Sequence, residues 1–339
     1  MARLLILVGA LCAVLVLAAC GEDAATGGSG TSGATAASFP VTIEHAFGST
    51  TITKPPERVA TWGWGSADAA IALDVVPVAI PFQSYGGDED GVLPWIAEAL
   101  EARGAATPTV LPDSAEEPPY EEIAAAEPDL ILAVYSGITR EQYELLSKIA
   151  PTVAYPGEAW ATPWKDTIRI VGEALGKDAE ASALLDDIDA RLAEKAAENP
   201  EMEGKSVAMV WDSAGTFYVY RKADPRVEAT LALGLTSAPA VDELASGEET
   251  FYYTLSYEQL DQLESDILVS FADTPALSRE FLTSSHGRAM SQVKEGRVAE
   301  VVGSSFIASV SPPTALSLTW GLDDYVEILA AAARATEAP

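Results

Sequence analysis

Two patterns of hydrophobic and polar positions alternate along the chain. Apolar runs with strand character lie at 58–62 and 75–80, and residues 66–73 between them have helical spacing, with Ser66 as a candidate N-cap. A strand, a helix and a second strand in this order form a βαβ unit, in which the two strands are parallel. Before this unit, residues 41–53 have the pattern of a short β-hairpin. The pattern therefore predicts an α/β protein built on parallel sheets.

A helix-then-strand segment occurs twice. Residues 120–135 read YEEIAAAEPDLILAVY, and residues 257–272 read YEQLDQLESDILVSFA. Helix-then-strand units resemble one another in general, but these two also share Tyr-Glu at the start and Glu-x-Asp before the strand. The repeat favours two equivalent lobes.

A long helical tract lies between the two copies. It covers residues 163–175, is interrupted at Gly176, and continues over 178–199 with one apolar stripe formed by Ala181, Leu184, Leu185, Ile188 and Leu192. The second piece is about 30 Å long at the usual helical rise, which is enough to reach from one lobe to the other. Strands at 206–211 and 216–220 are expected to begin the second lobe, and a helix over 314–333 is expected to close it.

The N-terminal segment carries an export pattern. Arg3 precedes an apolar run over residues 4–19 that is too short to span a bilayer comfortably, and the run ends in LAAC at Cys20. LAAC resembles the lipobox of bacterial lipoproteins, in which the cysteine is lipidated; the alternative is a plain signal peptide. We expect residues 1–19 to be the signal peptide and 20–38 a flexible tether. The mature chain would then be anchored by lipid on Cys20 to the extracytoplasmic face of the cell membrane.

Composition narrows the class of function. The chain has 51 Asp and Glu against 20 Lys and Arg, which argues against nucleic acid as a partner, while 48% hydrophobic residues argue against a disordered acidic tail. His45 and His286 are the only histidines, so we expect no site for a bare metal ion. WGWGS at residues 62–66 is not a G-x-S-x-G elbow. We therefore expect no enzyme and no resident cofactor.

Several segments together resemble a known family. They are PERVATWGWGSADAAIALDVVPVAIP, EEIAAAEPDLIL, LSKIAPTVAY, ALGLTSAP, LSYEQLDQLESDILV and VKEGRVAEVV, in this order from residue 56 to 302. The chain resembles ABC-transporter substrate-binding proteins of the type that capture iron-siderophores, haem or cobalamin. The resemblance implies an α/β fold of two Rossmann-like lobes with mainly parallel central sheets, bridged by a single long helix.

The resemblance also implies domain boundaries and a ligand. The N-terminal lobe would cover 39–162, the helical connector 163–203 and the C-terminal lobe 204–339. FQSYGGDEDGVLPW at residues 82–95 strengthens the similarity to the iron-siderophore branch. The expected function is capture of a ferric siderophore and its delivery to an ABC permease for iron uptake, with iron present only inside the ligand. A haem- or cobalamin-binding protein of the same class is the alternative.

Candidate ligand-binding residues follow the strands, because ligands of open α/β lobes lie beyond the carboxyl ends of parallel strands. Aromatic faces suit the apolar part of a siderophore, and arginines would donate to anionic oxygens. Each aromatic can instead belong to the core, and Arg221 can instead be a strand-end surface charge. The candidates are Trp64, Tyr85, Tyr135, Trp160, Trp164, Tyr220, Arg221, Arg226, Tyr252 and Phe306.

Two glutamates occupy the same position in the two repeat copies, Glu121 and Glu258. The resemblance implies that one glutamate from each lobe docks onto arginines of the permease dimer, and these residues match that position. The alternative is a local helix N-terminal role, worth under about 1 kcal/mol. We expect the protein to act as a monomer.

Overall fold

Two larger β-sheets, a separate two-stranded hairpin and the helices around them form the protein in the computed structural model, which describes residues 39–113, 117–247 and 249–337. These described residues belong to one compact unit. Cys20, the expected signal peptide and the expected tether lie outside the described residues. Within the described part of the chain, no helix combines the length and apolarity needed to cross a bilayer.

The first sheet is wholly parallel, with strand order β5-β4-β3-β6-β7. Its strands are short, with two to four residues each. The antiparallel hairpin of β1 and β2 precedes it, as the alternating pattern predicts. The strands are β1 (Val41–His45), β2 (Gly48–Ile52), β3 (Val59–Thr61), β4 (Ala79–Ile80), β5 (Thr109–Val110), β6 (Leu130–Ala133) and β7 (Thr152–Ala154).

The second sheet is mixed, with strand order β11-β9-β8-β12-β13 and β10 paired to β8. The strands β8, β10, β12 and β13 pair in parallel. The strand β9 is antiparallel to β8, because a tight hairpin at Ala214–Gly215 reverses the chain, and it also pairs antiparallel with β11. The strands are β8 (Ser206–Ser213), β9 (Thr216–Tyr220), β10 (Thr236–Ser237), β11 (Tyr252–Leu255), β12 (Ile267–Ala272) and β13 (Val298–Val302).

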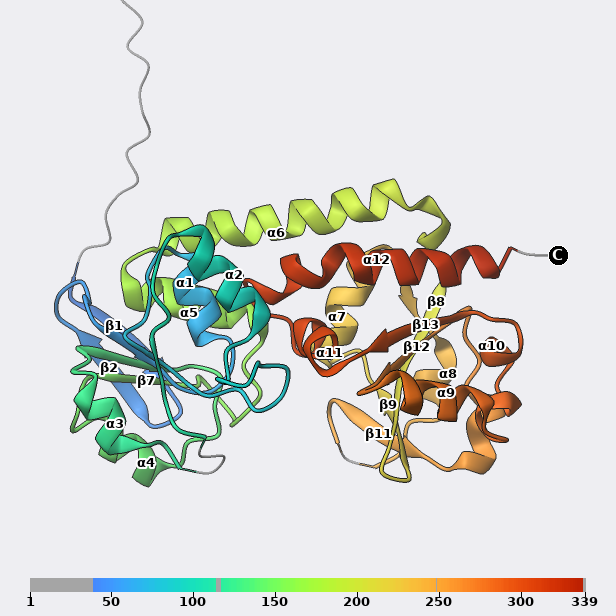
Figure 1. Cartoon of the computed structure of the whole chain (residues 1–339), viewed down its shortest axis with the longest axis horizontal. Helices are drawn as coiled ribbons and strands as arrows, with labels where there is room; N and C mark the ends of the chain where they lie inside the picture. Colours follow the sequence, from blue (N-terminus) through green and yellow to red (C-terminus); the bar gives the residue numbers. More distant parts are fainter. Residues whose placement is uncertain (1–38, 114–116, 248, 338–339) are drawn as a thin grey trace, which may run out of the picture. The chain divides into compact units, whose positions relative to one another are not determined.

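Helices cover both sheets, and α6 runs along both of them at the top of Figure 1, with α12 beside it. One apolar cluster is continuous through this region, because it includes Val59 of the first sheet, Ile188 of α6, Leu329 of α12 and Val269 of the second sheet. The helices are α1 (Ser66–Ala72), α2 (Pro94–Ala102), α3 (Tyr120–Ala125), α4 (Arg140–Leu146), α5 (Trp164–Leu175), α6 (Asp178–Glu198), α7 (Pro225–Leu231), α8 (Pro239–Glu243), α9 (Pro275–Thr283), α10 (Ser291–Lys294), α11 (Ser304–Val310) and α12 (Ser317–Ala335), with short 3-10 turns η1 (Pro200–Met202), η2 (Tyr257–Gln262) and η3 (Gly287–Ala289).

The start of α1 differs from the prediction. Gly65 is the N-cap, with φ 74°, and Ser66 is the first helical residue, buried and without a partner for its hydroxyl. The expected strand over 75–80 shrinks to Ala79–Ile80, and the last helix begins at Ser317 rather than 314. These boundaries depend on turns whose geometry the apolar pattern does not contain.

The two repeat copies do form equivalent units. The first is α3 followed by β6, the second is η2 followed by β12, and each strand lies beside the first strand of its sheet. The carboxylate of Asp129 accepts hydrogen bonds from the backbone N–H groups of Glu57 and Arg58, just before β3. Asp266 likewise accepts from the backbone N–H and the hydroxyl of Ser206, where β8 begins. The shared Glu-x-Asp therefore marks the point where each repeat strand is tied to its neighbour.

Candidate functional site

The first sheet has its topological switch between β3 and β6, and aromatic residues follow both strands. The backbone N–H of Trp64 donates to the backbone carbonyl of Tyr135 at 2.9 Å. This hydrogen bond joins the segment that follows β3 to the segment that follows β6. Gly63 between them has φ 87°, and a Cβ there would lie 2.3 Å from the Tyr135 carbonyl oxygen. A glycine is required at this position, because both the backbone conformation and the close approach exclude a side chain.

Trp160 is the most unusual aromatic residue of the site. It is 52% exposed and has φ 57°, a conformation that non-glycine residues rarely adopt. Its ring meets Tyr135 edge-on at 5.7 Å between centroids, and its indole lies over Gly137, where a Cβ would come within 2.2 Å of Nε1. A large apolar side chain held in strained backbone and exposed to solvent points to a ligand contact.

Three adjoining pockets surround these residues. The first, of about 240 Å³, lies between residues of the two sheets and has Tyr135 and Trp160 on one side and Tyr220, Tyr252 and Arg226 on the other. The second, of about 450 Å³, has its walls in the first half of the chain, including Trp62, Trp64, Phe82, Pro112 and Trp160.

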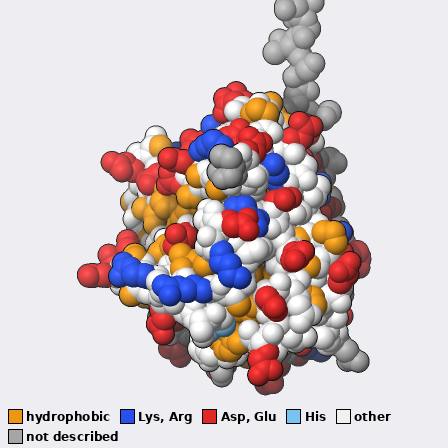
Figure 2. Space-filling model, turned by 90° about the vertical axis from the view of Figure 1, so that its right-hand side faces the viewer, with side chains coloured by type: hydrophobic (Ala, Val, Ile, Leu, Met, Phe, Trp, Pro, Cys, Tyr) orange, Lys and Arg blue, Asp and Glu red, His pale blue; other side chains and the backbone are white. Residues whose placement is uncertain are grey.

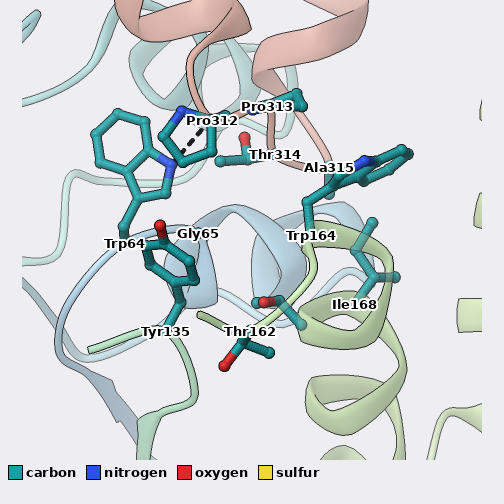
Figure 3. A pocket seen from close by; sticks show the side chains of 11 residues that line it. Trp64, Gly65, Tyr135, Thr162, Trp164, Ile168, Pro312, Pro313, Thr314 and Ala315 are labelled. Atoms are coloured by element: carbon teal, nitrogen blue, oxygen red, sulfur yellow. Dashed lines mark hydrogen bonds between the residues drawn. The ribbon is translucent and has the colours of Figure 1, made fainter. Parts of the chain in front are cut away.

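The third pocket is a narrow space of about 10 Å³ that includes Trp64, Tyr135, Trp164 and Pro312. Figure 3 shows Trp64 and Tyr135 on one side of it, Trp164 on the other, and the 312–315 segment above them. The indole N–H of Trp64 donates to the carbonyl of Pro312 at 3.1 Å.

The three pockets share walls and form one surface, which we call the groove. Trp64 belongs to the second and third pockets, Tyr135 to the first and third, and Trp160 to the first and second. The groove therefore offers flat aromatic faces from several directions to one ligand.

Arg226 is the cation of the groove, and it is already paired. Its Nε donates to Oδ1 of Asp224 at 2.7 Å, and its guanidinium carbon lies 3.9 Å from the centre of the Tyr220 ring. Burial raises the pKa of Asp224, although the Arg226 guanidinium beside it acts in the opposite direction. Asp224 also caps α7 through the backbone N–H of Arg226.

The remaining candidates lie in several places. Tyr135, Trp160, Tyr220, Arg226 and Tyr252 line the first pocket, and Trp64 and Trp164 line the others. Phe306 lies on α11 and packs against Tyr325, outside the three pockets. The Arg221 guanidinium is turned to the carbonyl of Ser246 at 2.8 Å and lies over Tyr253, also outside them.

Tyr85 connects the two halves of the chain and is not among the residues that line the three pockets of the groove. Its hydroxyl donates to Oδ1 of Asp273, just after β12, at 2.7 Å. The adjacent carbonyl of Gly86 accepts from the hydroxyl of Ser305 at 2.8 Å. Burial, together with the hydrogen bond to Asp273, raises the pKa of Tyr85. These contacts lie between the segment after β4 and the second half of the chain.

Glu121 and Glu258 are both exposed and take the second position of α3 and of η2. Their equivalence in the structure follows from the equivalence of the repeat copies. Within the described residues, no cluster of three or more His, Cys, Asp or Glu side chains is arranged to hold a metal ion.

The sequence reasoning missed two parts of the groove. One is the 312–315 segment, which reaches Trp64 across 248 residues of chain. The other is Asp224, whose carboxylate pairs with Arg226, the one arginine among the described residues that line the groove. The dipeptide Asp-Pro at 224–225 is a helix-start signal that could have placed Asp224 next to Arg226.

Comparisons with known proteins agree on one family. Residues 59–301 match the family model described as periplasmic binding protein. The protein described as "Probable siderophore-binding lipoprotein YfiY" from Bacillus subtilis is 26% identical over 86% of this chain and 88% of its own.

Two solved structures have the same fold. PiaA from Streptococcus pneumoniae in complex with ferrichrome has a TM-score of 0.77 and 33% identity, covering 87% of this chain and 99% of its own. A periplasmic solute-binding protein from Mycobacterium smegmatis has a TM-score of 0.74 and 29% identity, covering 86% and 98% of the two chains.

Proposed function

The chain belongs to the periplasmic binding protein family, and from this premise we propose that it captures a ferric siderophore in the groove and delivers it to an ABC permease. The proposal is supported by the relatives, one of which is described as siderophore-binding and another of which was solved with ferrichrome. The observation that carries it is Trp160, an exposed indole in left-handed backbone that borders two of the three pockets.

The chemistry of the groove suits such a ligand. In a ferric siderophore the iron is already wrapped by oxygen atoms of the chelator, so the protein needs no metal ligands of its own. It needs broad apolar faces and a few polar groups, and Trp64, Tyr135, Trp160 and Tyr252 supply the faces. Haem or cobalamin, bound by a protein of the same transporter class, are the alternative ligands.

Titration of tryptophan fluorescence tests the proposal. Ferrichrome should quench the emission of the mature protein with saturable binding, and Trp160→Ala should weaken that binding about three- to tenfold. Trp320→Phe is the control, because Trp320 lies on α12, donates to Glu98 and is not among the residues that line the three pockets. Binding of haem or cobalamin, with no binding of any ferric siderophore in a panel, would overturn the proposal.

We also propose the domain organisation and limited closure on ligand. The N-terminal lobe would cover 39–162, the connector 163–203 and the C-terminal lobe 204–339. The continuous apolar cluster through α6 and α12 supports a rigid connection, because bending it would expose buried side chains.

Membrane attachment through Cys20 is a separate proposal, supported by the LAAC pattern and by the lipoprotein relative. Cys20→Ala should move the protein from the membrane fraction to the soluble fraction and leave ligand affinity unchanged. A variant that still sediments with membranes as the wild type does would contradict the anchor.

Docking on the permease through Glu121 and Glu258 is supported by their exposure and by their equivalent positions. Two acidic groups at a fixed separation would orient the protein on a two-fold basic partner. The double variant Glu121→Arg, Glu258→Arg should keep ligand affinity and melting temperature yet stop uptake in cells. The control is Glu180→Arg with Glu194→Arg, two exposed positions on α6. Normal uptake by the first variant would rule out this docking.

A further inference from the structure

The balance of charge around the groove is negative. Of the described residues that line its three pockets, Arg226 is the only Lys or Arg, whereas Asp113, Asp224 and Glu228 are acidic. The whole chain has a formal net charge of −31, and Figure 2 shows Asp and Glu side chains with Lys and Arg among them on another face, the right-hand end of the molecule in Figure 1. The groove therefore offers a ligand little net positive charge.

The positive charge of Arg226 is not available to offset the acidic residues of the groove. Asp224 is 4% exposed and takes the Nε–H of Arg226, so the pair is neutral as a unit. The guanidinium is also stacked on Tyr220 and is 16% exposed. A cation already paired in a buried position attracts a further anion weakly, because the carboxylate beside it repels that anion.

Neighbouring cations are engaged elsewhere. Arg221 donates to the carbonyl of Ser246, Lys222 pairs with Asp242 at 3.3 Å, and Lys165 pairs with Asp189 at 2.7 Å. None of these three lines a pocket of the groove. By contrast, Glu228 lines the first pocket, is exposed, and has no basic partner within salt-bridge distance among the described residues.

Siderophore classes differ in the charge of their ferric complexes. A hydroxamate carries one negative charge, so three of them neutralise ferric iron, and an amine on the chelator makes the complex positive. A catecholate carries two charges, so three of them leave the complex strongly negative. Such an anion is repelled by the exposed carboxylates of Asp113 and Glu228, and the paired Arg226 compensates this repulsion weakly.

Building on the siderophore-binding function proposed above, we propose that the ligand is a ferric tris-hydroxamate complex with zero or positive net charge. The aromatic faces take the apolar part of the complex, and Glu228 at the rim attracts an ammonium group where the chelator has one. The groove rejects a ferric tris-catecholate by charge.

Three probes separate the ligand classes. Ferrichrome is an uncharged tris-hydroxamate complex, ferrioxamine B carries an ammonium group, and ferric enterobactin is a negatively charged tris-catecholate. We expect the two hydroxamates to bind and ferric enterobactin to bind about 100-fold more weakly or worse. Raising the ionic strength should leave the affinity for ferrichrome unchanged and weaken that for ferrioxamine B.

Variants test the role of charge directly. Glu228→Gln should weaken ferrioxamine B about two- to fourfold and leave ferrichrome unchanged. Glu280→Gln, at an exposed position on α9, is the control and should change neither. Equal effects of Glu228→Gln on both hydroxamates would contradict the role of Glu228.

The outcomes also distinguish this inference from the function on which it rests. Ferric enterobactin binding as tightly as ferrichrome would overturn the charge selection and leave the siderophore function standing. Failure of all three probes, with binding of haem or cobalamin, would overturn both.

Discussion

The position of the Trp160 side chain in the groove depends on a contact that requires glycine at position 137. Gly137 lies under the Trp160 indole, and its Cα carries no Cβ that could push the ring away. Trp160 is held from below by this glycine and from the side by Tyr135. The position of the exposed indole is therefore set by a residue that need not touch the ligand.

Gly137→Ala should displace the Trp160 ring. The added Cβ would lie 2.2 Å from Nε1, and an exposed side chain can move away at small cost, so the melting temperature should change little while ligand affinity falls about three- to tenfold. Gly157→Ala is the matched control, because nothing lies within 4 Å of a Cβ there. Titration and thermal melting of both variants check this; unchanged affinity in Gly137→Ala would contradict it.

Asp68 is a buried carboxyl between the two halves of the chain. Its Oδ1 accepts the indole N–H of Trp95 at 2.6 Å and the hydroxyl of Thr314. Burial raises the pKa of Asp68, and the two hydrogen bonds oppose this effect without cancelling it.

The stability of the protein should therefore depend on pH through Asp68. A carboxyl whose pKa is higher in the folded state binds its proton more tightly there, so its contribution is full below the unfolded pKa of about 4 and is lost as pH rises through the folded pKa. Asp68→Asn keeps the accepting oxygen and should flatten this decline. Urea unfolding at a series of pH values checks it, with exposed Asp186→Asn as control. The same pH slope in Asp68→Asn and wild type would contradict the assignment.

At the scale of elements, the repeated helix-then-strand segment predicts most of the arrangement of the sheets. The apolar runs and the two Glu-x-Asp sequences were enough to predict two sheets, the hairpin and the long helix, because these follow from local periodicity. The strand β9 was predicted, but its antiparallel pairing and the strand β11 were not, since pairing partners of short strands are set by tertiary contacts. For the same reason the sequence indicated several groove aromatics but not Pro312 or the pairing of Asp224.

Asp266 should stabilise the second sheet. Burial alone would raise the pKa of Asp266, but the hydrogen bonds from Ser206, together with the nearby charges of Lys205 and Arg297, outweigh it and the pKa is lowered. A lowered folded pKa gives stability that is present above the unfolded pKa of about 4 and is lost as pH falls through the folded value. Asp266→Ala should therefore cost about 1–3 kcal/mol of unfolding free energy at neutral pH and less in acid. Asp261→Ala, at an exposed position on η2, should cost little; equal losses in both variants would contradict this role.

At the scale of the whole molecule, the two sheets share one apolar cluster, and three hydrogen bonds join the halves of the chain beside the groove, those of Trp64, Tyr85 and Gly86. Such contacts resist a wide opening. Ligand binding should thus change the radius of gyration by less than about 1 Å, which small-angle X-ray scattering with and without ferrichrome can measure. A change of several ångströms in the radius of gyration would contradict this prediction, because it would require a hinge between the two halves of the chain.

The contact between Asp68 and Thr314 also has a consequence for how the protein folds while it is being synthesised. The two residues are 246 positions apart, and the ribosome adds Asp68 long before Thr314. The buried carboxyl of Asp68 and the indole of Trp64 can therefore form these hydrogen bonds only after the segment around residue 312 has been synthesised. A fragment ending before residue 304 should remain dependent on chaperones and sensitive to proteases, and adding the missing C-terminal piece in trans should restore its resistance.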